Sequence, residues 1–156
     1  PDDYLERNLD YYLARTSHGS TLSRVVHARL AVMAGDYDLS WKLFSDALES
    51  DFRDVQGGTT AEGIHAGVMA GTVWVAMTAY AGLNLDNDIV SFSPALPEHW
   101  KKISFSFTFK GDYYSCEVSH GLLSISVDSF DHKQVKIKLA GKETTIKTDK
   151  RTDIKF

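Results

Sequence analysis

The sequence predicts an α+β protein, with helices in the first half and an antiparallel, β-rich second half. In residues 2–81 apolar side chains recur at roughly every third or fourth position, which is the period of an amphipathic helix. In residues 103–109 (ISFSFTF) apolar and polar side chains alternate strictly, as in a half-buried strand. Because the period changes close to Gly82, we expect two domains, at residues 1–82 and 83–156.

Four helices are expected in the first domain, each indicated by apolar positions with helical spacing. They span residues 2–14, 21–33, 37–48 and about 60–81. Ser20 or Thr21 can cap the second helix, and the segment beginning at Asp36 can cap the third. Residues 51–60 lack periodicity and contain two glycines, which indicates a loop.

The fourth expected helix is unusually rich in small residues. It contains Gly63, Gly67 and Gly71, and each glycine costs a helix interior about 1 kcal/mol relative to alanine. Such a cost needs a packing reason, so we expect neighbouring helices to approach closely there. A helix that is apolar nearly all round is buried. We therefore expect this helix to lie within layers of other helices, with more partners than this chain supplies.

The second domain is predicted from a series of short alternating segments. Residues 89–92 lead into residues 94–97 (PALP), which we expect to form a stiff, extended linker. The expected strands are residues 103–109, 113–119, 122–127, 135–139 and 144–147. Strands at this spacing, separated by glycine-containing turns, predict an antiparallel sheet or a two-layer β-sandwich.

Composition and charge exclude several classes of protein. With 43% hydrophobic and 24% charged residues, the chain has the composition of a soluble globular protein. The first 82 residues carry six Lys/Arg against eleven Asp/Glu and the rest carry eleven against ten, so neither half suggests nucleic-acid binding. No apolar run reaches the length of a membrane span. Cys116 is the single cysteine, so we expect no internal disulfide and a cytoplasmic location.

Two stretches place hydroxyls, glycines and a histidine just ahead of a helical run. They are residues 16–23 (TSHGSTLS) and 57–67 (GGTTAEGIHAG). Helix starts leave backbone N–H groups unpaired and favour negative charge, so two converging starts would make an anion site. The candidate residues for that site are Ser20, Thr21 and His65, with His18 and Gly19 as additional candidates.

Each candidate also has a structural alternative. Capping alone would explain Ser20 and Thr21, and a loop histidine such as His18 is commonly exposed. A histidine within a small-residue helix commonly bonds a carbonyl, which would make His65 structural. No histidine pair has metal-ligand spacing and no CxxC or HxxxH occurs, so we expect no metal site.

Four motifs, in this order, resemble the C-terminal part of the family 65 glycoside hydrolases, which include inverting phosphorylases of maltose, trehalose and kojibiose. The motifs are residues 16–23, 59–67 (TTAEGIHAG), 70–74 (AGTVW) and 92–97 (FSPALP) followed by Trp100. The resemblance covers nearly the whole chain. It implies the C-terminal helices of an (α/α)6 barrel followed by a small antiparallel β-sandwich domain. It also agrees with a chain that starts at Pro1, without a methionine, and that we expect to be a piece of a longer protein.

The resemblance further implies a mechanism. In such phosphorylases a carboxylic acid protonates the glycosidic oxygen of an α-glucoside while phosphate attacks the anomeric carbon from the opposite face, which gives β-glucose 1-phosphate and a sugar. The resemblance assigns phosphate binding to Ser20, Thr21 and His65. Inorganic phosphate is then a substrate, no cofactor is needed, and the full-length enzyme is expected to be a homodimer with no nucleic-acid or membrane partner. The family's general acid lies upstream of these motifs, so we expect no catalytic residue in this chain and no activity of the chain alone.

Two other functions stay open. A trehalase-like hydrolase of the same family should carry a second carboxylate in place of the phosphate donors. A non-enzymatic carbohydrate-binding or structural β-sandwich should expose aromatic side chains on one sheet face. Tyr113, Tyr114 and Phe130 are the candidates for such a face.

Overall fold

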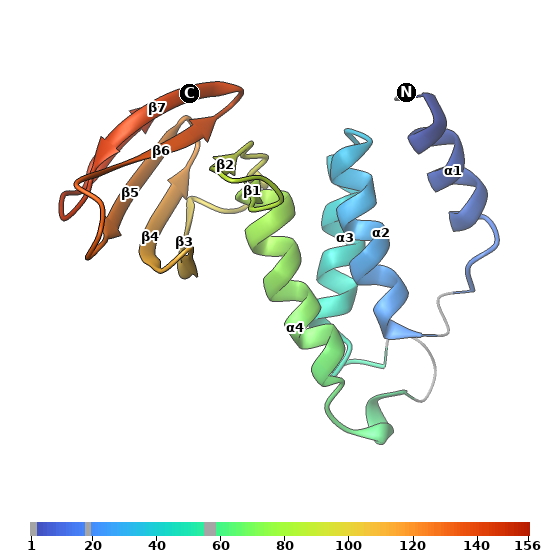
Figure 1. Cartoon of the computed structure of the whole chain (residues 1–156). Coiled ribbons are helices and arrows are strands. Elements are labelled where there is room, and N and C mark those ends of the chain that lie inside the picture. The colour runs from blue at the N-terminus through green and yellow to red at the C-terminus, as the bar shows by residue number, and fades with distance from the viewer. Residues whose placement is uncertain (1–2, 18–19, 55–58) are drawn as a thin grey trace. The chain divides into compact units, whose positions relative to one another are not determined.

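The computed structural model describes residues 3–17, 20–54 and 59–156 of the chain. The chain divides into two compact units, Pro1–Ala79 and Tyr80–Phe156. The first unit consists of helices and the second of strands (Figure 1). The predicted α+β class is confirmed.

The described residues of the helical unit form four α-helices, three of which match the predicted bounds to within one residue. The helical segments are α1 (Asp3–Leu13), α2 (Thr21–Met33), α3 (Tyr37–Glu49), η1 (Thr59–Glu62, a 3₁₀ turn), α4 (Ala66–Val75) and η2 (Ala76–Tyr80, a π-helix that continues α4). Helices α2, α3 and α4 pack against one another (Figure 1). Asp36 caps α3 as expected, because its Oδ1 accepts a hydrogen bond of 3.0 Å from the backbone N–H of Leu39.

The fourth helix begins later than the sequence predicted. Residues Thr59–Glu62 form a separate 3₁₀ turn, and Gly63 has a φ of 99°. This left-handed conformation suits glycine and cannot continue an α-helix. Regular helix resumes only at Ala66, so His65 occupies the N-cap position of α4 and does not lie inside a helix.

Helix α4 approaches α2 through its glycines. A Cβ atom on Gly71 would lie 2.7 Å from Cγ1 of Val25, and one on Gly67 would lie 3.4 Å from Cδ2 of Leu22. Gly71 therefore has the packing reason that the sequence predicted, because it lets the backbone of α4 come closer to α2 than an alanine would. At Gly67 an alanine would make about an ordinary van der Waals contact with Leu22.

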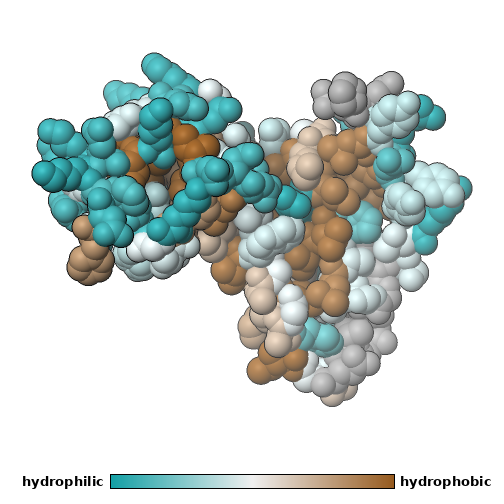
Figure 2. All heavy atoms as spheres, viewed as in Figure 1, coloured by the Kyte–Doolittle hydropathy of each residue, from teal (hydrophilic) through white to brown (hydrophobic). Residues whose placement is uncertain are grey.

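Within this chain α4 is buried on one side only, as expected if its other partners lie outside the chain. Its buried residues lie along one stripe, at Val68, Thr72 and Val75. On the other side Val73 is 58% exposed, and Trp74 is 43% exposed even though the Arg29 guanidinium lies 4.5 Å from its ring centre. Figure 2 shows hydrophobic residues gathered over the visible face of the helical unit.

The β unit consists of two four-stranded sheets. The strands are β1 (Leu83–Asn84), β2 (Val90–Phe92), β3 (Lys102–Phe109), β4 (Asp112–Ser119), β5 (Leu122–Asp128), β6 (Gln134–Leu139), β7 (Lys142–Lys147) and β8 (Thr152–Lys155). One sheet has the order β1-β2-β6-β7 and the other the order β3-β4-β5-β8. The five predicted strands are all present.

Two features of the sheets differ from the prediction. Residues Val90–Phe92 form strand β2, not the approach to a linker, and β2 pairs with β6 in parallel, with Val90 opposite Ile137. The arrangement is therefore antiparallel in every pair but one. Strands β1 and β8 were not predicted, because two and four residues are too few to show an alternating pattern.

The core of the β unit comes from alternate residues of both sheets. Strand β4 is buried at every second position, including Cys116 and Val118, and Leu123 and Ile125 of β5 have no exposed surface. Phe92 and Ile137 are the corresponding buried residues of the other sheet. Burial raises the pKa of the Cys116 thiol to about 12, so this cysteine is held in its unreactive form.

Candidate functional site

Ser20 and Thr21 lie at the start of α2. Ser20 is the N-cap residue in an extended conformation, and its exposed side chain makes no capping hydrogen bond within the described residues. Its carbonyl instead accepts a hydrogen bond of 2.8 Å from the Ser23 hydroxyl. Thr21 is the first helical residue and is buried. The capping alternative therefore does not account for the Ser20 hydroxyl.

His65 lies at the start of α4, where it is held by a carboxylate from the segment after α3. Its Nδ1 lies 2.7 Å from Oδ1 of Asp51, and its backbone N–H donates to both oxygens of the same carboxylate at 3.2 Å. The two side chains are mostly buried, with 19% of His65 and 10% of Asp51 exposed. The hydrogen bond from His65 lowers the pKa of the Asp51 carboxyl, which therefore stays ionised at neutral pH.

The structure brings these two helix starts together. Leu22 and Gly67, the second residues of α2 and α4, face each other, and both helices begin at the same end of the helical unit (Figure 1). Ser20 and His65 each lie two residues ahead of this contact. The other two candidates, His18 and Gly19, lie outside the described residues.

The converging starts offer several groups for an anion. Backbone N–H groups of two helices and the Ser20 hydroxyl are donors, and an imidazole can add a further donor. Arg24, buried near the start of α2, adds positive charge, and its Nε lies 3.7 Å from Oδ2 of Asp46. The Oγ1 of Thr60 is buried and has no hydrogen-bond partner among the described residues.

Asp51 and Arg24 were not identified from the sequence. Asp51 lies 14 residues before His65 in a segment that was interpreted as a loop, and nothing in its neighbours marks it. In the sequence, Arg24 is simply one charged residue on an amphipathic helix. Only the folding of α3 and α4 back along α2 places these side chains at the same end of the unit.

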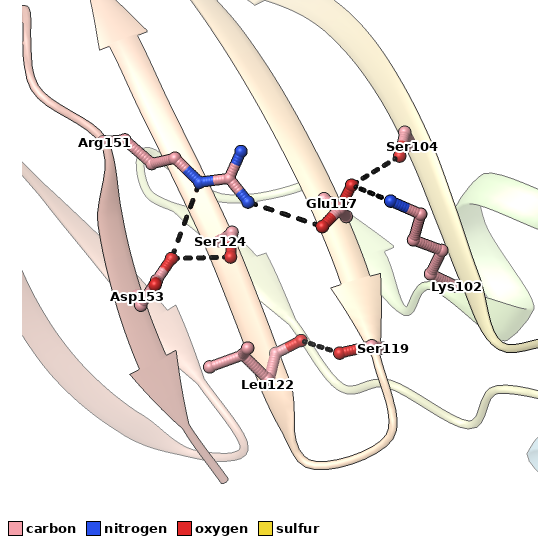
Figure 3. A network of polar contacts seen from close by, with 8 residues as sticks. All are labelled: Lys102, Ser104, Glu117, Ser119, Leu122, Ser124, Arg151 and Asp153. Atoms are coloured by element: carbon pink, nitrogen blue, oxygen red, sulfur yellow. Dashed lines mark hydrogen bonds and ion pairs between the residues drawn. The ribbon is translucent and has the colours of Figure 1, made fainter.

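A second polar cluster lies on the outer face of the sheet β3-β4-β5-β8. Lys102 and Ser104 donate to one oxygen of Glu117, at 2.7 and 3.3 Å, and Arg151 donates to the other at 3.4 Å (Figure 3). Arg151 also lies 3.6 Å from Asp153. Ser104, Glu117 and Arg151 border a cavity of about 320 Å³. Because its acids and bases neutralise one another across the strands, we interpret this cluster as a brace of the sheet.

A second cavity of about 360 Å³ lies within the β unit and is bordered by a second histidine–carboxylate pair. Nδ1 of His132 lies 3.2 Å from Oδ2 of the buried Asp112. Lys110 and Asp88, 2.6 Å apart, border the same cavity. Here too the charges are matched, and the His132 backbone is tied by hydrogen bonds to Ser129 and Thr148, which indicates a structural role.

The aromatic residues considered for sugar binding do not form a common platform. Tyr114 is 4% exposed, and its ring stacks on Phe107 with the ring centres 5.0 Å apart. Tyr113 alternates with Tyr114 on β4 and is half exposed, while Phe130 is exposed on the loop after β5. Tyr114 is thus a core residue and is not accessible for stacking on a sugar.

The part of the chain that the structure describes contains neither a candidate metal site nor a candidate membrane-spanning helix. No three His, Cys, Asp or Glu side chains there are grouped so that they could hold a metal ion. No described helix has the length and apolar character needed to cross a bilayer.

Comparison with known proteins identifies the family. Residues 1–74 match the model of the glycosyl hydrolase family 65 central catalytic domain, and residues 83–150 match that of the family 65 C-terminal domain. The chain therefore belongs to glycosyl hydrolase family 65.

The similar proteins include several phosphorylases. The chain is 44% identical over 130 residues to the trehalose 6-phosphate phosphorylase of Lactococcus lactis. The matched region covers 82% of this chain and 17% of that protein. It is 35% identical over 141 residues to the kojibiose phosphorylase of Caldanaerobacter subterraneus, covering 89% of this chain and 18% of that protein. A solved structure, a putative kojibiose phosphorylase from the human microbiome, matches the whole chain with a TM-score of 0.84 and 26% identity, over 21% of its own length. The chain thus spans less than a fifth of the two curated relatives.

Proposed function

We propose that this chain is the C-terminal part of an inverting disaccharide phosphorylase, in which it contributes part of the site for inorganic phosphate. The complete enzyme would cleave an α-glucosidic bond with phosphate and release β-glucose 1-phosphate and a sugar. Family membership and the names of the relatives support the reaction class. The observation that carries the proposal is the contact between Leu22 and Gly67, which places the two helix starts side by side.

In this proposal Ser20, Thr21 and His65 are the phosphate-binding residues of the chain. Helix starts and hydroxyl groups bind a dianion through neutral N–H and O–H donors, and a protonated imidazole adds a charged one. The helical unit then represents the C-terminal helices of an (α/α)6 barrel. The general acid and most of the sugar pocket belong to the rest of the enzyme, so we expect residues 1–156 alone to be inactive. We expect a cytoplasmic, homodimeric enzyme that needs no cofactor or metal.

Kinetics of the complete enzyme at varied phosphate test this proposal. His65→Ala should raise the KM for phosphate roughly tenfold or more, and Ser20→Ala should raise it less, because a charged donor contributes more than a neutral one. The KM for the disaccharide should change little in both variants. If the phosphate dependence of His65→Ala equals that of the unsubstituted enzyme, His65 is a structural residue and the assignment fails.

Hydrolysis is the competing reaction for a member of this family. A hydrolase would need a carboxylate that activates water, and Asp51 is a carboxylate beside His65. Both Asp51 oxygens already accept hydrogen bonds from His65, which fits a supporting residue better than a base. Release of free glucose without phosphate, from trehalose, trehalose 6-phosphate, kojibiose, nigerose or maltose, would favour the hydrolase. Strict dependence on phosphate would exclude it, and the same panel would identify the disaccharide.

A further inference from the structure

The contact between Asp51 and His65 is more than a helix cap. A cap requires only that a side chain accepts from the first backbone N–H groups of a helix, and Asp51 does this through its 3.2 Å contacts to the His65 N–H. The same carboxylate also holds the imidazole, with 2.7 Å between Oδ1 and Nδ1. One side chain therefore fixes both the backbone and the ring of His65.

This double contact has two chemical consequences. An ionised carboxylate is only an acceptor, so Nδ1 of His65 carries the proton in the pair and any ligand of the ring is bound through Nε2. A carboxylate at one ring nitrogen also stabilises the imidazolium, in which the other nitrogen becomes a charged donor. A dianion needs such a donor, because an unprotonated Nε2 would present it with a lone pair.

Several other titratable side chains on or beside the helices packed against α4 have partners of their own. On α2 and α3, Arg24 lies 3.7 Å from Asp46. Arg53, after α3, pairs with Glu49 at 3.1 Å. His27 of α2 donates from Nδ1 to the Ser23 carbonyl at 2.7 Å. Among the described hydrogen bonds and ion pairs, Asp51 is the carboxylate that contacts His65.

We propose that Asp51 is a positioning residue for phosphate, which orients the His65 imidazole and keeps it protonated while phosphate is bound. This inference rests on the proposed function, because it assumes that His65 binds phosphate. It adds a residue that does not itself touch phosphate. The negative charge of Asp51 is tolerated next to the dianion because the imidazolium lies between them and carries the compensating charge.

The test compares Asp51→Asn with a matched control in the complete enzyme. The control, Asp112→Asn, makes the same change in the other histidine–carboxylate pair of the chain, where Asp112 contacts His132. For Asp51→Asn we expect the KM for phosphate to rise roughly tenfold or more, as is typical when a partner of a ligand-binding histidine is lost. As the pH is raised, the affinity for phosphate should also be lost at a lower pH than in the unsubstituted enzyme, because the imidazolium has lost the carboxylate that stabilises it. Asp112→Asn should change neither quantity, although it can lower thermal stability.

A second variant keeps the test decisive if Asp51→Asn folds poorly. Asp51→Glu retains the charge but moves the carboxylate, so it should raise the KM for phosphate while the pH at which affinity falls stays near that of the unsubstituted enzyme. An unchanged KM and pH profile in Asp51→Asn, with a raised KM in His65→Ala, would overturn the positioning role and leave the phosphate site intact. An unchanged KM in His65→Ala would instead overturn the proposed function itself.

Discussion

The two units of this chain differ in the size of the side chains that they bury completely. The largest fully buried side chains of the β unit are Tyr80, Phe92, Leu123, Ile125 and Ile137. Among the described residues of the helical unit, the apolar side chains buried to the same degree are smaller, and they are Ala28, Ala31, Ala47, Val68 and Val75. Two sheets with opposed apolar faces can complete a core of their own, whereas a few helices with glycine-rich contacts cannot.

The exposed surfaces show the same difference. Large exposed hydrophobic side chains of the helical unit include Leu22, Val26 and Met33 on one face of α2, and Val73 and Trp74 on α4. In the β unit the described examples are Tyr113, Phe130 and Phe156. Figure 2 shows mostly hydrophilic residues over the β unit and hydrophobic ones over the helices. From this difference we expect the β unit to hold its fold by itself, and the helical unit to lie against further helices.

The largest expected effect is a difference in resistance to proteolysis between the two units. In residues 1–156 taken alone, we expect a protease to cut the helical unit first and to leave a resistant fragment that contains residues 102–155. The helical unit buries less apolar surface, so local opening costs less free energy there. Mass spectrometry of the fragments over time measures this. A resistant fragment from α2 to α4, with the strands already degraded, would reverse the comparison.

The second expected effect concerns the free energy of opening the β unit. Ile125→Ala, at a position with no exposed surface, should lower it by about 2–5 kcal/mol. Val73→Ala, on the exposed side of α4, should change it by less than about 0.5 kcal/mol. Labelling of the buried Cys116 thiol during urea titration reports this opening directly. A loss well below about 2 kcal/mol in Ile125→Ala would show that the core of the β unit is not packed as inferred.

The smallest expected effect comes from the polar brace on the outer face of the β unit. Hydrogen bonding from Lys102 is the main cause that lowers the pKa of the Glu117 carboxyl. Its stabilising contribution is therefore present above the usual carboxyl pKa and is lost as the pH falls below it. Glu117→Gln should lower the melting temperature slightly at pH 7 and hardly at all at pH 3. A loss at pH 7 as large as that of Ile125→Ala would mean that the cluster does more than brace the strands.

Much of the fold follows from local patterns in the sequence. Alternation in residues 103–127 identified three strands, and helical spacing identified α2 and α3, because both patterns record which side of an element is buried. The cap of α3 by Asp36 was also predicted from the local sequence. Four ordered motifs were enough to indicate the family to which the chain belongs.

Other features depend on contacts between distant residues, and only the tertiary structure decided them. The parallel pairing of β2 with β6 joins segments about 47 residues apart, and β8 is a strand because β5 lies beside it, with Ile154 opposite Leu123. The start of α4 depends on the backbone at Gly63, which a count of apolar residues does not record.

The candidate site divides in the same way. The sequence by itself predicted the candidate donors at the helix starts, Ser20, Thr21 and His65, because hydroxyls and a histidine ahead of a helical run are a local pattern. The tertiary structure decided that the two starts lie together and that Asp51 holds His65. The physical reason is that a hydrogen bond across 14 residues, between a group just after α3 and one just before α4, forms only when those two helices have packed.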